Sequence, residues 1–325
     1  MGHLYIPNSI SLRNFDNLFQ NNDFDFSDKK ISITFHPTYV AMAPIGLAFY
    51  AAIGDLIKTQ GIENAAKLNF RIRSIPYLQR MGLFRSLGFS NPIETVEHDE
   101  TGRFIPITKI RTSEELTHFI KTIDPILHTN RNNSRAIKHV FSEVLRNVLE
   151  HSGSPAGGNV CATYNRKRQK ISIGISDIGE GLLTHLSKHH SVANYKSAIK
   201  LALTPGISGV TNRIGGDSEN AGAGLFFTKC IAQSTNNHFV IYSGNTYYKL
   251  RFSAKRTLNK FNSNPFDDYC TIKENLPFFP GTLVGIDINI KDSQAFDNLI
   301  ENIGSAYRES VKKNQKDFYK RIQFS

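Results

Sequence analysis

The sequence is poor in cysteine and has no long apolar run, and both absences narrow the class of protein. Its three cysteines, Cys161, Cys230 and Cys270, are too few and too scattered for a disulfide framework or a zinc site. No stretch approaches the roughly 18–20 consecutive apolar residues that cross a bilayer, and no secretory signal follows Met1. We therefore expect a protein of the reducing cytoplasm with no membrane partner.

Internal repeats, low-complexity tracts and coiled-coil heptads are absent too. The hydrophobic content of 40 % and charged content of 21 % are those of an ordinary globular protein. The 325 residues suffice for two domains with their own cores. Acidic residues are outnumbered, which leaves a net charge of +11, but Lys and Arg are spread along the chain. The mild basic cluster at residues 312–321 has the pattern of a solvated amphipathic helix. A nucleic-acid partner is therefore an alternative that rests on net charge alone.

The first 112 residues alternate strand and helix patterns after an N-terminal arm, residues 1–29, that shows no period and is expected to be irregular. The predicted elements are a strand over 31–35, a helix over 43–60 that Gly61 ends, a strand over 67–72, and a short helix over 77–84 that Pro76 opens and Gly88 closes. This order predicts a small α/β unit with a parallel strand pair, followed by a connector, within residues 30–112.

The short helix carries a resemblance. Its sequence Tyr77-Leu78-Gln79-Arg80-Met81-Gly82-Leu83 resembles the last helix of STAS domains, the fold of bacterial anti-sigma-factor antagonists. Those antagonists carry a phosphorylatable Ser or Thr at the start of their first long helix. The corresponding stretch here, Ala41-Met42-Ala43-Pro44-Ile45-Gly46, has no hydroxyl group. The resemblance therefore implies an interaction or scaffolding role without the phosphoswitch.

A helix predicted over residues 134–151 places polar residues beside an apolar stripe. Glu143, Asn147 and His151 follow one another at four-residue spacing, so they form a row along one border of the stripe. An Asn oxygen is a suitable ligand for Mg²⁺, and a Glu one turn earlier can hold or deprotonate a water. The alternative is an ordinary amphipathic helix with three polar neighbours.

Three glycine-containing segments follow this helix. A strand over 170–176 runs into Asp177-x-Gly179-x-Gly181, where the carboxylate could accept a hydrogen bond from the adenine amino group while the glycines bring backbone close to a ligand. Gly222-x-Gly224 leads into a helix from Leu225 to Gln233, a place for phosphates. Gly281-Thr282 opens a late strand. Taken singly, these segments are equally typical of an Asx-capped turn, a glycine-rich helix start and a turn before a strand.

Together, in this order, the four segments resemble the GHKL superfamily of gyrase B subunits, MutL, heat-shock chaperones and histidine kinases. Glu143-x-x-x-Asn147 is similar to its N box, Asp177-x-Gly179-x-Gly181 and Gly222-x-Gly224 to its glycine boxes, and Gly281-Thr282 to its closing Gly-Thr. The resemblance implies a two-layer α/β sandwich with a mixed sheet, the Bergerat ATP-binding fold, over residues 113–292. It also implies the cofactors ATP and Mg²⁺, with Asp177 on adenine, Asn147 on the metal, Glu143 as catalytic base, and nucleotide contacts from Gly179, Gly181, Gly222, Gly224, Leu225 and Thr282.

Three further segments have open roles under this resemblance. Residues 182–221 would be a lid over ATP, in which Lys188, Arg213 and His185 are either phosphate contacts or solvated lid charges. Residues 256–279 form an insertion that is either a partner-binding loop or a surface elaboration. Residues 293–325 are expected to be a basic helix or tail.

The leading hypothesis for function is an ATPase that acts as a conformational switch for a protein partner. A protein kinase of the anti-sigma-factor or histidine-kinase type is the second hypothesis, although no two-helix phosphoacceptor segment precedes the ATP-binding region. An ATP-regulated nucleic-acid-binding protein is the third. A homodimer stays open.

Overall fold

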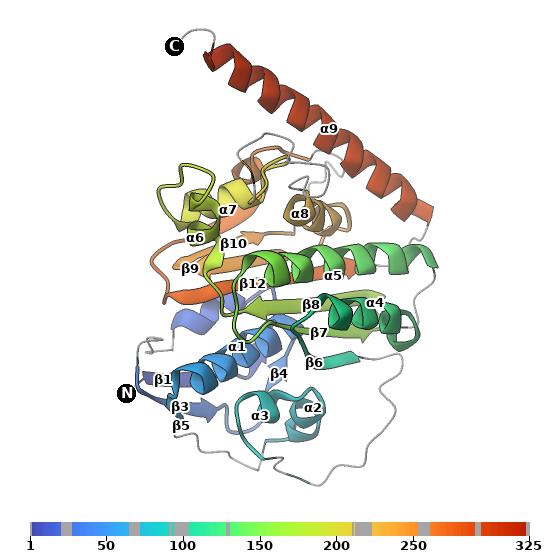
Figure 1. The fold of residues 1–325 in the computed structure, drawn as a ribbon. Coiled ribbons are helices and arrows are strands. Elements are labelled where there is room, and N and C mark those ends of the chain that lie inside the picture. Colours follow the sequence, from blue (N-terminus) through green and yellow to red (C-terminus); the bar gives the residue numbers. More distant parts are fainter. Residues whose placement is uncertain are drawn as a thin grey trace.

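Two main β-sheets organise the described residues, a small parallel sheet near the N-terminus and a large antiparallel sheet after it (Figure 1). The computed structural model describes residues 2–20, 28–64, 72–90, 93, 104–127, 131–209, 211, 223–252, 261–289 and 294–322. An α/β fold with a small N-terminal unit is therefore confirmed at this level of detail.

The small sheet has the strand order β1-β3-β5, and both of its pairings are parallel. Its strands are β1 (Gly2–Ile6), β3 (Lys30–Phe35) and β5 (Glu63–Asn64). Helix α1 (Pro44–Gln60) precedes β5 and ends at Gly61, whose φ of 64° lies in the left-handed region that glycine adopts without strain. The expected first strand and first helix are confirmed, and the small sheet is parallel, with β1 and β5 as partners of β3 that the sequence did not predict.

The expectation that residues 1–29 form an irregular arm is wrong. This segment contains β1, a short strand β2 (Ser9–Ile10) that pairs with β4 (Ala41–Met42), and a 3₁₀ helix η1 (Phe15–Gln20). Leu4 and Ile6 are fully buried at alternate positions of β1. A five-residue strand whose partner lies 29 positions away along the chain gives only a weak local pattern, so its pairing decides its structure.

The second half of the N-terminal unit also differs from expectation. The predicted short helix is divided into α2 (Ile75–Arg80) and α3 (Leu83–Ser86), because Gly82 between them has a φ of 80°. Gly88 follows α3 with a φ of 84°, as expected for a helix stop. The predicted strand over 67–72 lies almost wholly outside the described residues.

The large sheet has seven strands in the order β11-β10-β9-β12-β8-β7-β6, and each neighbouring pair is antiparallel. Its strands are β6 (Phe104–Ile110), β7 (Gly158–Asn165), β8 (Lys170–Asp177), β9 (Phe239–Gly244), β10 (Thr246–Leu250), β11 (Cys270–Lys273) and β12 (Phe279–Asn289). The expected mixed sheet is therefore wrong, because short connections join β7 to β8 and β9 to β10 as hairpins, while β12 enters between β8 and β9. Strand β6 belongs to this sheet although the sequence places it in the connector.

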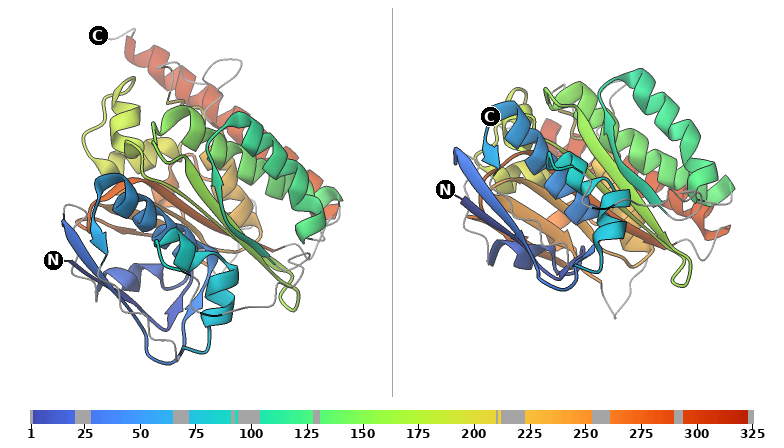
Figure 2. Two further views of the ribbon diagram at one scale, coloured as in Figure 1. Left: turned by 60° about the horizontal axis from the view of Figure 1, so that its bottom comes forward. Right: turned by 90° about the horizontal axis from the view of Figure 1, so that it is seen from below.

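One face of the large sheet is covered by α4 (Ser113–Leu127), α5 (Arg131–His151) and α8 (Gly224–Ser234) (Figures 1 and 2). The predicted apolar stripe of α5 lies in this layer, where Val140, Phe141 and Leu145 are fully buried and share a core with Ile173 and Ile175 of β8. Burial of these side chains is the main driving force for the layer. The helices predicted over 134–151 and 225–233 are present as α5 and α8, and α5 begins three residues before the predicted Ser134.

The opposite face of the sheet is covered by α1, so the expected two-layer sandwich has a further layer (Figure 2). The residues of β8 that face α1, Gly174 and Ser176, are small. Ser176 Oγ donates to Ala48 O at 2.6 Å, and a Cβ atom on Gly174 would overlap the backbone of Pro44. The absence of a side chain at Gly174 is what lets α1 come this close to the sheet.

Buried ion pairs fix the N-terminal unit to the large sheet at two places. Asp55 of α1 accepts hydrogen bonds from Lys109 of β6 and, at 2.6 Å, from Asn159 of β7. Asp16 of η1 pairs with Lys249 at 2.7 Å and with Lys273 at 2.8 Å, on β10 and β11. Both aspartates are less than a tenth exposed, so these contacts specify one docking geometry.

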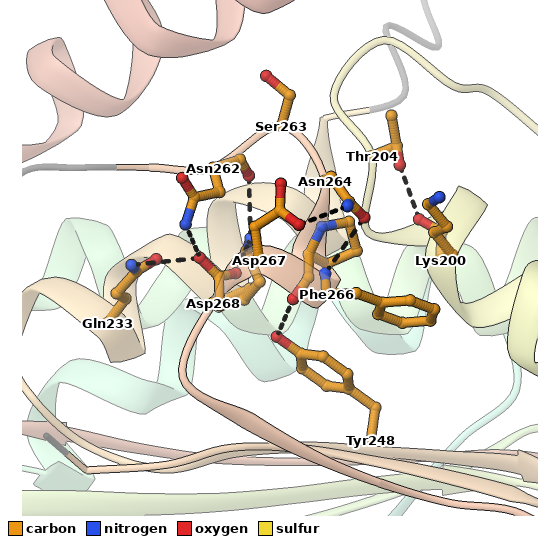
Figure 3. A network of polar contacts seen from close by, with 12 residues as sticks. Lys200, Thr204, Gln233, Tyr248, Asn262, Ser263, Asn264, Phe266, Asp267 and Asp268 are labelled. Carbon is orange, nitrogen blue, oxygen red and sulfur yellow. Dashed lines mark hydrogen bonds and ion pairs between the residues drawn. The ribbon is translucent and has the colours of Figure 1, made fainter.

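The described part of the predicted insertion, residues 261–279, is anchored to its surroundings (Figure 3). It contains the 3₁₀ helix η2 (Pro265–Asp267) and the edge strand β11. Asp268 forms a fully buried ion pair with Lys229 of α8 at 2.6 Å, and it accepts a hydrogen bond from Asn262 at 2.9 Å. The described part of the insertion therefore continues the sheet and holds α8.

The C-terminal segment forms the long helix α9 (Gln294–Ile322), which crosses the helical layer and extends beyond it (Figure 1). Ser310 of α9 shares a hydrogen bond of 2.7 Å with Ser263 of the insertion. Lys312, Lys313 and Lys316 are exposed, so the expected solvated basic helix is confirmed for this part. None of the helices within the described ranges has the length and apolar character of a membrane span.

Candidate functional site

A cavity of about 310 Å³ lies between α5, the end of β8, and the helices α6 (Gly181–Ser187), α7 (Tyr195–Ala202) and α8. Seven of the nine residues to which the resemblance gives a role at ATP or Mg²⁺ line it: Glu143, Asn147, Asp177, Gly181, Gly224, Leu225 and Thr282. Gly179 is not among the lining residues, and Gly222 is outside the described residues. The fold thus brings to one cavity motifs that span about 140 positions of the sequence.

One border row of α5 forms a wall of the cavity. His139, Glu143, Asn147 and His151 all line it, as their four-residue spacing requires. Glu143 Oε1 lies 3.6 Å from a guanidinium nitrogen of Arg146, which is itself half exposed. The carboxylate and the amide therefore face the same space, one helical turn apart.

His139 is a lining residue that the sequence analysis did not single out. Its ring packs edge-on against Phe227 at a centroid distance of 5.5 Å, and its Nε2 atom is buried with no hydrogen-bond partner among the described residues. Burial lowers the pKa of His139, against the opposing effect of Glu143. Its position four residues before Glu143 is the signal that could have identified it.

The start of α8 lies against Glu143. A Cβ atom on Gly224 would lie 2.7 Å from Glu143 Oε2 and 3.0 Å from Glu143 Cβ, so glycine favours this close approach of the two elements. The residue before the helix, Ala223, provides no side-chain cap. Among the described residues, therefore, no side-chain cap occupies the first N–H groups of α8, and they can bind an anion beside the Glu143 carboxylate.

Asp177, at the end of β8, is 1 % exposed. Its Oδ1 atom accepts a hydrogen bond of 2.7 Å from the backbone of Gly179. Burial raises the pKa of Asp177 to about 7, although the backbone N–H groups of Gly179 and Thr282 act in the opposite direction. Gly281, with a φ of 91°, brings its backbone against this carboxyl group, where a Cβ atom would lie 2.7 Å from Oδ1. The Gly-Thr segment and Asp177 therefore form one end of the cavity.

The glycines after Asp177 serve close backbone packing. A Cβ atom on Gly179 would overlap the backbone of Ser152 at the end of α5, and the N–H of Glu180 donates to Ser152 O at 2.7 Å. Gly181, with a φ of 71°, opens α6 close to Ser243. This packing fixes α6 beside the C-terminal end of α5.

The lid residues have different environments from one another. His185 of α6 stacks on His151 at a centroid distance of 4.9 Å and is 15 % exposed, so it is not a solvated lid charge. Lys188 is half exposed and pairs with Glu180 at 2.6 Å. Of the two alternatives for this residue, its environment is that of a solvated lid charge. Arg213 lies outside the described residues.

A scan of the chain against models of protein families and a search of curated proteins find no match. Within the described ranges, no cluster of three or more His, Cys, Asp or Glu side chains could hold a metal ion. The chemistry of the cavity must therefore be interpreted from its own residues: a buried acid, an amide and a carboxylate on one helix, and an uncapped helix start.

Proposed function

We propose that this chain binds Mg²⁺–ATP in the cavity and acts as an ATP-driven conformational switch for a protein partner. The observation that carries the proposal is the convergence of Asp177, the Glu143–Asn147 pair and the start of α8 on one cavity. These groups match the adenine, metal and phosphate parts of one ligand. The resemblance to the GHKL superfamily supports the same assignment.

Each lining group has a role in this proposal. Asp177 accepts a hydrogen bond from the adenine amino group, and it would repel the carbonyl oxygen that guanine has at that position. Asn147 offers an oxygen to Mg²⁺, which keeps water ligands and takes others from the nucleotide phosphates. The start of α8 receives phosphate oxygens, and Glu143 beside it holds or deprotonates the attacking water.

Switching would follow from the connections of α8. Its first turn borders the phosphate end of the cavity, while Lys229, on its second turn, is paired with Asp268 of the insertion. A shift of α8 on nucleotide binding would therefore move the insertion and α9, which are joined through Ser263 and Ser310. This outer region is where we place the interface with the partner.

A protein kinase is the second candidate. The parallel α/β unit packed on the back of the sheet favours it, because its helices α2 and α3 carry the STAS-like sequence. Incubation with γ-labelled ATP separates the two functions: release of free phosphate favours the switch, and label on protein favours the kinase.

Calorimetric titration with Mg²⁺–ATP tests the binding site itself. We expect Asp177→Asn to weaken ATP binding roughly 10- to 150-fold, since a hydrogen bond to a charged group contributes about 1.5–3 kcal/mol. The matched control is Asp287→Asn, a buried aspartate of β12 paired with Lys170 outside the cavity, which should leave the affinity unchanged. Absence of ATP binding by the wild-type chain would refute the proposal.

A further inference from the structure

The two ring nitrogens of His185 have different surroundings, and this fixes the tautomer. Nδ1 lies 3.3 Å from Glu180 Oε1. Burial raises the pKa of Glu180, but Lys188 and His185 together lower it below its usual value, so the group is a carboxylate. A carboxylate only accepts hydrogen bonds, and Nδ1 must therefore carry the proton.

Nε2 of His185 is consequently an acceptor. Burial and the neighbouring His151 lower the pKa of His185, which keeps the ring neutral near pH 7. Nε2 is buried at the edge of the cavity beside Gly209, and no group of the described residues forms a hydrogen bond with it. Leaving an acceptor buried and unpaired costs about 1–3 kcal/mol, so a donor on the ligand would relieve this cost.

The chemistry of ATP limits which donor that is. At neutral pH its phosphates only accept hydrogen bonds, so its donors are the adenine amino group and the two ribose hydroxyls. One N–H of the amino group is assigned to Asp177, and a contact of the second N–H with His185 would leave the affinity independent of the ribose hydroxyls, which the deoxy analogues below measure. In addition, His151 lies eight residues after Glu143 on α5, which is about 12 Å along the helix axis, so the histidine pair is remote from the proposed phosphate end.

We propose that His185 Nε2 accepts a hydrogen bond from a ribose hydroxyl of the bound nucleotide and makes the site selective for ribonucleotides over deoxyribonucleotides. The inference rests on the proposed ATP site and assigns a sugar contact within it. His151 is then a positioning residue, because its ring stacks on His185 and fixes the direction of Nε2.

The test compares the affinities for ATP, 2′-deoxy-ATP and 3′-deoxy-ATP by calorimetry. The wild-type chain should bind ATP about 2- to 12-fold more tightly than one of the deoxy analogues, the range for a neutral hydrogen bond. His185→Phe keeps a ring against His151 but has no acceptor, so it should bind ATP and that analogue equally. His189→Phe, an exposed residue of the same segment outside the cavity lining, is the control that should keep the preference.

A second variant tests the role of His185 Nε2 without changing His185 itself. Gly209→Ala introduces a Cβ atom that overlaps the position of Nε2, so it should also abolish the ribose preference.

Equal wild-type affinities for ATP and both deoxy analogues would overturn the inference and leave the ATP site intact, and this measurement needs no variant to fold. A His185→Phe chain that keeps the ribose preference but no longer distinguishes ATP from AMP would also overturn it, since His185 would then contact phosphate. Absence of binding by every adenine nucleotide would overturn the proposed function itself.

Discussion

At the scale of single residues, the buried carboxyl group of Asp177 lowers the free energy of unfolding when the pH rises and the group must ionise. Its pKa is about 7 in the cavity, against 3.8 for a free aspartate. Between these two values the folded chain keeps a proton that the unfolded chain has released, so the free energy of unfolding falls as the pH rises from about 4 to 7. A group that is unfavourable for stability and lies in a cavity is typical of a functional site.

This cost predicts the pH dependence of Asp177→Asn. The variant has no ionisation there, so its unfolding free energy relative to wild type should increase by about 1.4 kcal/mol per pH unit between pH 4 and 7 and stay level above pH 7. Urea denaturation followed by circular dichroism at several pH values gives this difference, in which the contributions of other groups cancel. A difference that does not vary with pH would mean that Asp177 ionises in the folded chain as it does in water.

Glu143→Ala should separate nucleotide binding from turnover. A general base contributes typically about 10²–10⁴-fold to rate and little to ground-state affinity, so the variant should retain ATP while phosphate release or transfer falls by that factor. Glu150→Ala is the matched control, because Glu150 lies on the same helix and pairs with the same Arg146 but does not line the cavity. Turnover at the wild-type rate in the Glu143 variant would show that Glu143 is not the general base and is only a carboxylate on the helix surface.

The sequence identified the site residues whose spacing or turn chemistry is local. Glu143 and Asn147 follow from helix periodicity, Asp177 from its glycine segment and Thr282 from the resemblance alone, and all four line the cavity. The environment of His185 could not be predicted, because its stacking on His151 depends on the docking of α6 beside α5. A resemblance can indicate that a lid residue is near the ligand, but only the surroundings show its tautomer.

At the scale of elements, prediction succeeded where a segment determines its own structure. Helix α1 ends at Gly61, which the sequence analysis identified as its stop. Strands β1 and β6 were missed as sheet members because each depends on a partner more than 25 positions away, β3 and β7 respectively. The antiparallel order of the large sheet has the same origin, since β12 pairs with β8 across about 110 residues.

Helix α8 is the element whose position matters most for the proposed switch. The neutral double variant Lys229→Met/Asp268→Asn keeps an acceptor for Asn262 but removes the buried ion pair. Its stability should be close to that of wild type, because the lost attraction is offset by the removal of two desolvated charges. Turnover should nevertheless fall by up to about 10²-fold, the loss typical of a displacement of ~1 Å.

Two further chains make this test specific. Asp268→Asn alone leaves Lys229 buried and unpaired and should reduce the unfolding free energy by about 3–5 kcal/mol. Lys196→Ala/Glu274→Ala removes an exposed pair between α7 and the segment after β11, and should change neither property. Unaltered turnover in the neutral double variant would show that the ion pair does not position α8.

At the scale of the whole molecule, the N-terminal unit and the large sheet share a core. Val240, Phe279 and Leu283 of the sheet belong to the same buried cluster as the apolar residues of α1. The polar contacts of Asp55 and Asp16 close the two edges of this interface. The expected boundary at Ser113 therefore separates two sequence patterns but not two packed cores. Both α1 and β6 precede this boundary, yet α1 packs on the large sheet and β6 is one of its strands.

A chain limited to residues 113–325 tests whether that division is physical. Loss of α1 would expose the back of the sheet, and re-exposing Val240, Phe279 and Leu283 alone costs roughly 5–9 kcal/mol, at about 1.5–3 kcal/mol for each side chain. This is comparable with the entire stability of an ordinary domain, about 5–15 kcal/mol, so the shortened chain should show no cooperative thermal transition by circular dichroism. The full chain should unfold in a single transition that is the same in the near- and far-ultraviolet signals. A shortened chain that melts cooperatively as a monomer would instead make residues 113–292 an independent domain.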